Sequence, residues 1–239
     1  MRQDLYEQMY RQEEYYWWHQ SKRALVKQFL PPKSNLHILD IGCGTGKLME
    51  ELTQFGSVWG VDTHPQAIKF CRRRGLKHIY LQRLPNLRLK HKFDVIICLD
   101  VLEHIADDLT ALKTIHHLLK TDGRLILTVP VYPWLFSYWD KILGHYRRYT
   151  PSRLERVLKR AKLKPIKITF VYTFLLPLIV PFRLIRQIVF TRIKPQSDFI
   201  NLPMWLHKLL FKLASVEHKF LRSYNLPFGL SLFCIVQKQ

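Results

Sequence analysis

A glycine-rich segment that follows a short apolar run is the first place where this sequence could bind a ligand. Residues 40–46 read Asp-Ile-Gly-Cys-Gly-Thr-Gly, and they come directly after the apolar residues 36–39. Glycine adopts backbone conformations that other residues avoid, so such a segment can turn tightly and let a ligand approach the main chain. Amide groups at the start of a following helix can hold a carboxylate or a phosphate.

Asp62 is the second residue whose position suits ligand binding. It ends the predicted strand 57–62 and follows Gly42 by 20 residues. A carboxylate at that place can accept hydrogen bonds from both ribose hydroxyls of a nucleoside. A nicotinamide dinucleotide is disfavoured, because Lys47 occupies the last glycine position of the G-x-G-x-x-G pattern. The two features together predict a nucleoside-containing cofactor at the carboxyl ends of neighbouring strands.

His104 and His145 are candidate general bases, because histidine can take a proton from a hydroxyl group near neutral pH. His145 lies in the run Gly-His-Tyr-Arg-Arg-Tyr-Thr of residues 144–150. Each histidine also has a structural interpretation. His104 could cap a helix or support another side chain, and Arg147 and Arg148 could tie loops together around His145. These arginines could instead bind a phosphate or carboxylate of the substrate.

Asp100, Glu103 and His104 also offer groups that can ligate a metal. A hard divalent cation needs more oxygen ligands than these residues supply. We therefore predict catalysis without a metal, an expectation that full activity in the presence of a chelator would support.

Strands alternate with helices along most of the chain, which predicts a parallel sheet with right-handed crossovers. We expect strands at 36–41, 57–62, 79–81, 93–99, 124–129, 166–171 and 231–236. The predicted fold is an α/β fold with a seven-stranded, mostly parallel sheet, an N-terminal helical cap and a helical insertion before the last strand. The expected boundaries are a lid at 1–30, a core at 31–171 and 229–239, and an insertion at 172–228.

Three of these segments carry a family resemblance. They are residues 39–46 (Leu-Asp-Ile-Gly-Cys-Gly-Thr-Gly), 61–62 (Val-Asp) and 93–104 (Phe-Asp-Val-Ile-Ile-Cys-Leu-Asp-Val-Leu-Glu-His). They resemble the motifs of class I S-adenosylmethionine-dependent methyltransferases, in the ubiquinone-biosynthesis-like (type 11) group. Residues 16–18 with 22–23, and residues 144–150, resemble a bacterial subset of that group. The resemblance implies a Rossmann-like fold, methyltransferase activity and S-adenosyl-L-methionine as the cofactor.

The resemblance also implies roles for residues in the first two motifs. Gly42, Gly44 and Gly46 would pack against the methionine part of the cofactor. Asp40 would order this loop or meet the ammonium group of the cofactor. Asp62 would hold the ribose.

Three further residues receive roles from the resemblance. Leu99 would line the methionine side near the sulfonium. Arg23 would meet the cofactor's carboxylate if the aromatic N-terminal helix forms a lid, whereas ordinary core packing is the other interpretation of that helix. Gln82 stands where such families often place an acidic residue against the adenine amine, and its amide could make that contact instead.

The positive charge concentrates in the last third of the chain. The net charge is +20, and residues 151–239 carry 16 Lys and Arg against 3 Asp and Glu. Residues 168–182 are uncharged but too short to span a bilayer, whereas apolar residues interleaved with Lys and Trp at 204–213 are typical of a membrane-interface helix. A buried strand and a core helix are the alternative. We predict a small-molecule acceptor, lipophilic or lipid-linked, and an anionic membrane surface as a partner.

Two other functions remain open from the sequence. The charge and the aromatic residues would suit an RNA methyltransferase, although no RNA-binding module is recognisable and nucleic acid is disfavoured as a partner. A non-catalytic membrane-docked scaffold would not need the intact glycines and Asp62. The four cysteines form no C-x-x-C pair and the N-terminus has no apolar signal segment, so we expect a cytoplasmic protein that binds the membrane peripherally. The pattern does not indicate an oligomeric state.

Overall fold

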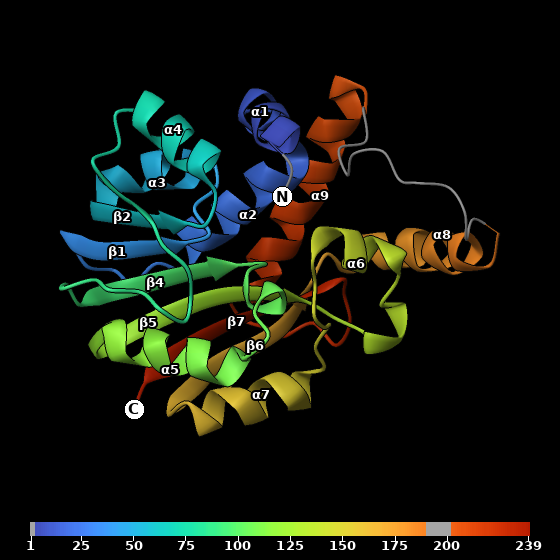
Figure 1. The fold of residues 1–239 in the computed structure, drawn as a ribbon. Helices are drawn as coiled ribbons and strands as arrows, with labels where there is room; N and C mark the ends of the chain where they lie inside the picture. The colour runs from blue at the N-terminus through green and yellow to red at the C-terminus, as the bar shows by residue number, and fades with distance from the viewer. Residues whose placement is uncertain (1–2, 190–201) are drawn as a thin grey trace.

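The apolar segments of the sequence form the strands of one sheet (Figure 1). The structure is a computed structural model that describes residues 3–189 and 202–239. The strand order is β3-β2-β1-β4-β5-β7-β6, with β7 antiparallel to β5 and β6 and the other pairs parallel. The predicted seven-stranded, mostly parallel sheet is therefore confirmed. The strands are β1 Leu36–Ile41, β2 Gly56–Asp62, β3 His78–Leu81, β4 Phe93–Leu99, β5 Leu119–Pro130, β6 Leu163–Val171 and β7 Ser231–Lys238.

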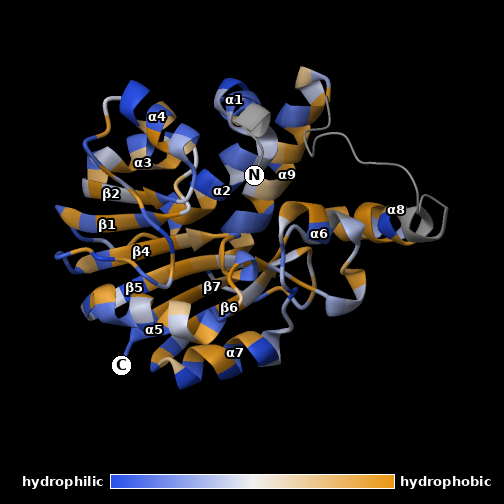
Figure 2. Cartoon of the chain, viewed as in Figure 1, coloured by the Kyte–Doolittle hydropathy of each residue, from blue (hydrophilic) through white to orange (hydrophobic). Residues whose placement is uncertain are grey.

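Helices cover both faces of this sheet. One face carries α2 (Trp17–Gln28), α3 (Lys47–Leu52) and α9 (Met204–Leu221), and the other carries α5 (Asp108–Leu118) and α7 (Pro151–Arg160). Figure 2 shows the apolar strands between these layers. The remaining elements are α1 Gln3–Gln12, α4 Pro65–Arg73, α6 Tyr138–Leu143, α8 Leu176–Val189, η1 Thr53–Phe55, η2 Leu102–His104, η3 Pro133–Leu135 and η4 Thr173–Leu175.

The central strands are apolar on both faces because helices cover both sides. Ile38 and Ile97 pack into the core under α2, α3 and α9, whereas Leu39 and Ile96 pack into the core under α5 and α7. Successive side chains of a strand point to opposite faces, so a strand buried on both faces needs a largely apolar run. Apolar runs interrupted by His37 and Asp40 in β1, and by Asp94 in β4, made these two strands recognisable from the sequence.

Several boundaries differ from the prediction. The N-terminal segment forms two helices, because the chain turns at residues 13–16 between α1 and α2. β5 begins at Leu119, five residues before the expected start, and the Asp122-Gly123 turn lies inside this strand with a φ of 62° at Asp122. Residues 1–2 of the expected lid and 190–201 of the expected insertion lie outside the described residues.

The insertion between β6 and β7 contributes to the core through α9. Its buried face packs against α2 and contains His207, Ala214, His218 and Leu221. Glu217 accepts hydrogen bonds from the backbone amides of Tyr172 and Thr173, where the chain leaves β6. Among the described residues, no helix combines the length and apolar character needed to cross a membrane.

Candidate cofactor and catalytic site

The loop after β1 meets the carboxyl end of β2. The Gly44 amide donates a hydrogen bond to Asp62 Oδ2 at 3.0 Å, and the Gly42 amide donates to the Val61 carbonyl at 2.8 Å. Gly42, Gly44 and Gly46 all have positive φ, a conformation that favours glycine. A Cβ atom at Gly42 would lie 2.4 Å from Val101 Cγ2, so neighbouring side chains also exclude a larger residue there. The sequence prediction correctly placed this loop beside Asp62.

Two buried carboxylates lie next to this loop. Asp62 Oδ1 accepts a hydrogen bond from the His64 amide at 3.0 Å. Burial raises the pKa of Asp62, although the hydrogen bonds from the Gly44 and His64 amides oppose the rise. Burial, and then the charge of Asp62, raise the pKa of Asp40 to about 7.

The chemistry of this pair fits S-adenosylmethionine, which carries ribose hydroxyls and two cationic groups. A cation near Asp40 and Asp62 would relieve the repulsion between their charges, and oriented carboxylate oxygens can accept from hydroxyls. Asp62 would hold the ribose and Asp40 would face the cationic end. The glycine turn would receive the methionine part.

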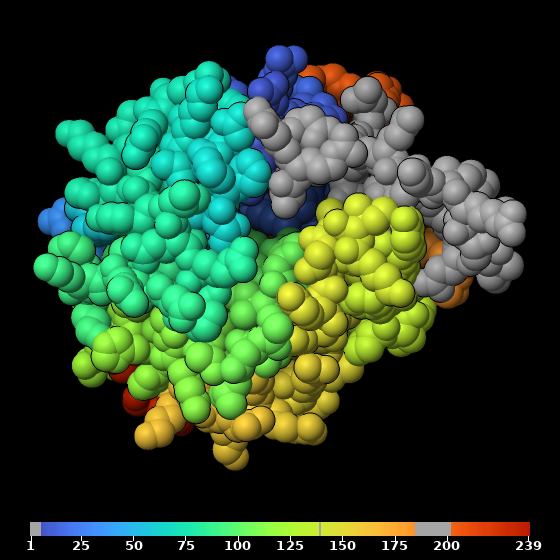
Figure 3. Space-filling view, viewed as in Figure 1, coloured from blue at the N-terminus to red at the C-terminus, as the bar shows by residue number. Residues whose placement is uncertain are grey.

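Helix α1 lies across this loop, at the place expected for a lid. The Tyr6 hydroxyl donates to Asp62 Oδ1 at 3.3 Å, and its ring stacks on His64. Met9 contacts Gly44: a Cβ atom added there would lie 2.9 Å from Met9 Cε. Figure 3 shows the dark blue N-terminal helices within the hollow between turquoise α4 and yellow α6. A ribose hydroxyl that bonds Asp62 Oδ1 would compete with Tyr6 for this atom.

Glu13, directly after the end of α1, connects this helix to the glycine loop and to the end of α4. It accepts hydrogen bonds from the Thr45 hydroxyl and the Arg74 guanidinium. Arg23 donates to the Glu13 carbonyl at 2.8 Å and to Glu51 Oε1 at 2.7 Å. The guanidinium of Arg23 is thus engaged between the N-terminal helices and α3, and its contact with a cofactor carboxylate stays a prediction. Sequence reasoning missed Tyr6 and Glu13, because their partners lie 32 to 61 residues away.

The other two predicted cofactor residues lie at the ends of neighbouring strands. Leu99 ends β4 and is partly buried against the core under α2 and α3. Gln82 follows β3, and its side-chain oxygen accepts a hydrogen bond from the Arg88 amide at 2.8 Å. The hydrogen bond to Arg88 uses only the side-chain oxygen of Gln82, and the side-chain NH2 group could still donate to adenine. The adenine contact stays a prediction.

His104 and His145 lie together beyond the carboxyl end of β4. Their ring centroids are 4.6 Å apart and the rings meet edge to face. Partial burial, and then the neighbouring His145, lower the pKa of His104 to about 4. His104 is thus neutral near pH 7, but a pKa this far below neutral makes it a weak base, and its catalytic role stays a prediction.

Asp140 orients His145. Its Oδ1 atom lies 3.0 Å from His145 Nδ1 and accepts from Arg148 Nε at 2.8 Å. Burial alone would raise the pKa of Asp140, but His145 and Arg148 outweigh burial and hold this pKa well below its usual range. With Nδ1–H directed at Asp140, the other ring nitrogen of His145 is the one that can accept a proton.

The two arginines of this run are engaged in the protein. Arg148 is buried against Asp140 and the Val131 carbonyl, and Arg147 forms an ion pair with Asp108 at 2.9 Å. Both arginines thus bind groups of the protein, which agrees with the structural interpretation of Arg147 and Arg148 given from the sequence. The role of Asp140 was not predicted, since five residues separate it from His145 and α6 was not expected.

Glu103 joins the two histidines in a group that could bind a metal ion. Ligand atoms of Glu103, His104 and His145 all lie within 4.8 Å of one another. Two histidines and one glutamate are a donor set found at catalytic zinc sites. Burial raises the pKa of Glu103 well above its usual range, and Glu103 Oε2 accepts no hydrogen bond within the described part of the chain.

The match to known families covers most of this architecture. Residues 10–168, which include the glycine loop, Asp62 and both histidines, match the family described as "Methyltransferase domain". The chain belongs to this methyltransferase family. The family resemblance inferred from residues 39–46, 61–62 and 93–104 is confirmed.

Relatives of this methyltransferase domain point to the ubiquinone-like group. A ubiquinone biosynthesis O-methyltransferase from Haemophilus ducreyi is 34% identical over 103 residues, which cover 38% of this chain and 44% of that protein. One from Cereibacter sphaeroides is 28% identical over 155 residues, which cover 56% of this chain and 63% of that protein. The chain spans about half the length of the curated relatives it matches.

Solved structures confirm the predicted fold of the domain. A putative methyltransferase from Haloferax volcanii, in complex with the Trm112 activator, has a TM-score of 0.63 at 16% identity and covers 98% of this chain and 94% of that one. An N-methyltransferase from Bradyrhizobium japonicum in complex with S-adenosylhomocysteine has a TM-score of 0.54 at 16% identity, covering 92% and 87%. Together with the family match, they support the prediction of S-adenosylmethionine as the cofactor.

The pKa of Asp40 predicts a pH dependence of cofactor binding. The ionised carboxylate attracts the cationic ammonium group, so affinity falls as pH drops through 7 and Asp40 takes up a proton. S-adenosylhomocysteine should bind about tenfold more weakly at pH 6 than at pH 8. Calorimetric titration at both pH values measures this ratio, and Asp40→Asn should abolish it. An affinity that is equal at both pH values in the wild type, or a tenfold ratio that persists in Asp40→Asn, contradicts this role.

Proposed function

We propose that this protein transfers a methyl group to a hydroxyl oxygen of a small, lipophilic or lipid-linked acceptor. The observation that carries the proposal is the position of His145, held by Asp140 and paired with His104 beyond the end of β4. Asp100 directly follows Leu99 at the end of β4 and interacts electrostatically with both histidines. The two histidines therefore lie near the same edge of the sheet as the glycine loop.

Removing the acceptor proton is the chemical task of the histidines. When bound, S-adenosylmethionine supplies an electrophilic methyl group and leaves as a neutral thioether. A hydroxyl oxygen becomes a better nucleophile when a base takes its proton as the new carbon–oxygen bond forms. His145 can take this proton while Asp140 stabilises the imidazolium, and neutral His104 beside it is the second candidate. Positioning of the acceptor contributes the rest of the acceleration.

The surface around His145 supports a lipophilic acceptor. The segment 134–146 carries four large apolar or aromatic side chains that are exposed, namely Trp134, Tyr138, Ile142 and Tyr146. Exposed apolar groups gathered on one segment are typical of binding surfaces. The name of the Haemophilus ducreyi relative agrees with O-methylation in the synthesis of an isoprenoid-tailed quinone. We further propose that the protein meets this acceptor at an anionic membrane surface.

A pair of phenolic acceptors that differ only in an isoprenoid tail tests the acceptor class. Buried apolar area contributes binding energy, so kcat/KM should be at least about tenfold higher for the tailed phenol. Transfer of a radiolabelled methyl group to each phenol measures this ratio. Equal rates for both phenols would exclude a tail-binding surface, and methylation of an amine analogue alone would exclude the hydroxyl acceptor.

Removal of the base should slow methyl transfer without weakening cofactor binding. His145→Ala should lower kcat by about 100-fold or more, and Asp140→Asn by a smaller factor, with little change in KM for the cofactor. Asp122→Asn, at an exposed carboxyl group near the start of β5 and thus at the opposite edge of the sheet from the histidines, is the matched control and should retain full kcat.

Two results would contradict this assignment. One is an unchanged kcat in His145→Ala. The other is loss of activity of the wild-type protein with a chelator, restored by zinc, because Glu103, His104 and His145 would then act as metal ligands.

A further inference from the structure

Helix α9 has an outer face that the fold leaves apolar. Its buried face packs on α2, but large apolar side chains recur on the opposite side at intervals of four, four, three and four residues. These outer residues are Trp205, Leu209, Leu213, Val216 and Phe220, and Trp205 and Phe220 are 65% and 57% exposed. Such spacing places them in one stripe along the helix. We call these five residues the outer stripe.

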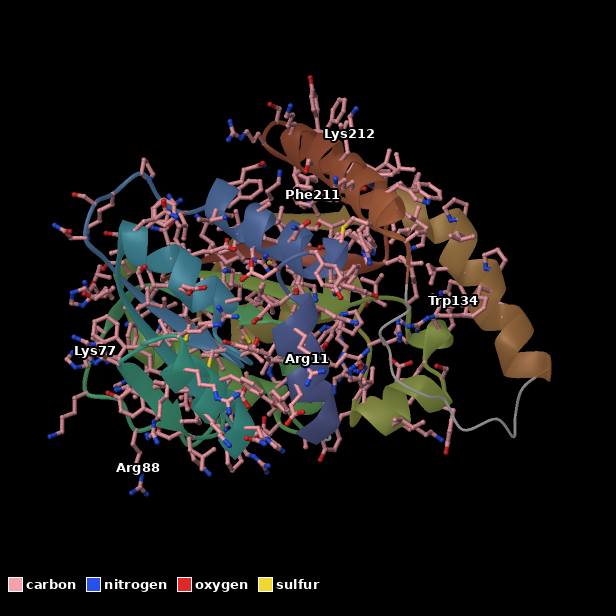
Figure 4. The ribbon with its side chains drawn as sticks, turned by 90° about the horizontal axis from the view of Figure 1, so that it is seen from above. Arg11, Lys77, Arg88, Trp134, Phe211 and Lys212 are labelled. Carbon is pink, nitrogen blue, oxygen red and sulfur yellow. The ribbon has the colours of Figure 1, made fainter. Side chains whose placement is uncertain are left out.

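Lysines follow one edge of the outer stripe. Lys208, Lys212 and Lys219 are all exposed and lie four and seven residues apart, so they share one side of the helix. Two consecutive residues of α9 show its two faces in Figure 4: Phe211 is directed toward the body of the protein, and Lys212 is directed away from it. The single acidic residue of α9, Glu217, is buried. The outer face of this helix is thus apolar and cationic.

We propose that the outer face of α9 docks on an anionic lipid bilayer, with the helix lying in the plane of the membrane interface. An apolar stripe can enter the boundary between headgroups and acyl chains while the lysines at its edge bind anionic headgroups. A tryptophan near the start of the stripe suits this boundary, since its ring is large and its N–H is polar. The outer stripe extends over 16 residues, from Trp205 to Phe220, and its ends lie about 22 Å apart along the helix axis.

Charge favours a membrane over a second copy of this chain. Two copies that each carry a net charge of +20 repel each other, and a twofold contact through α9 would bring the same lysines close together. An anionic bilayer instead attracts this charge. The buried face of α9 is occupied by the protein itself, since His207 Nδ1 accepts from the Trp17 amide and the His207 ring contacts those of Tyr15 and Tyr16, which leaves the outer face for the bilayer.

The docking face rests on the membrane partner proposed above, and vesicle co-sedimentation tests it without reference to methyl transfer, so its failure would leave the hydroxyl acceptor and the role of His145 unaffected. The full-length protein is mixed at low salt with vesicles of phosphatidylcholine alone or with 30% phosphatidylglycerol. The wild type should bind the anionic vesicles at least about tenfold more tightly. The triple variant Trp205→Ser, Leu213→Ser, Phe220→Ser should lose at least about tenfold in affinity for them.

A pair of charge variants locates the electrostatic contribution. Replacing Lys208, Lys212 and Lys219 by Gln should weaken binding to anionic vesicles at least about tenfold. The matched control replaces Arg156, Lys159 and Arg160 by Gln. These are three exposed cations of α7, on the other face of the sheet, and their replacement should change the affinity for anionic vesicles less than about threefold. Retained affinity for S-adenosylhomocysteine shows that each variant is folded.

Four results would overturn the proposal. The wild type could fail to bind anionic vesicles, or the outer-stripe variant could bind them as the wild type does. The two charge variants could lose affinity equally. Analytical ultracentrifugation could show a wild-type dimer that the outer-stripe variant converts to a monomer, in which case the stripe is a contact between copies.

Discussion

The hydrogen bond from the Gly44 amide to Asp62 Oδ2 is the interaction on which the candidate site depends. It joins the turn after β1 to the end of β2, and it requires a positive φ that Gly44 tolerates. The parallel pairing of β1 with β2 and β4 brings three strand ends to one edge. Asp40, Asp62 and Leu99 therefore lie together although up to 59 residues separate them in the chain. A cation bound at this edge would relieve the repulsion between the two buried carboxylates, which is why we propose that the cationic cofactor binds there.

The same edge combines a preorganised part with a part that must adjust. The glycine turn and Asp62 are fixed by backbone hydrogen bonds, whereas the Tyr6 hydroxyl uses a carboxylate oxygen that a ribose would need. Helix α1 is held by aromatic stacking on α4 and by Glu13, so a movement of α1 away from Asp62 would break these contacts. His145 is held separately by Asp140 on α6. In the proposed function, the cofactor would be held by residues of the sheet edge and the acceptor by residues that follow β5.

The parts of the fold and the site that could be predicted are those marked by a pattern within a short stretch of sequence. Largely apolar runs gave β1 and β4, and the glycine spacing with Asp62 correctly predicted that the loop after β1 lies beside the end of β2. Contacts made by Tyr6 and Glu13 depend on tertiary packing, which leaves no local spacing to recognise, whereas Asp140 was missed because α6 was not expected. The β5 boundary was wrong because its strand continues through the Asp122-Gly123 turn. For the basic insertion, one face of α9 is core, as one interpretation of its sequence expected, and the membrane-interface interpretation of its exposed face stays a prediction.

Calorimetric titration with S-adenosylhomocysteine tests the central claim most directly, because the claim concerns one carboxylate and one ligand. The wild type should bind S-adenosylhomocysteine and not NAD, and Asp62→Ala should weaken binding by about 100-fold, since it removes charged hydrogen-bond acceptors. Circular dichroism would confirm that the variant is folded. Equal affinity of a folded Asp62→Ala variant, or binding of NAD in place of S-adenosylhomocysteine, would contradict the account.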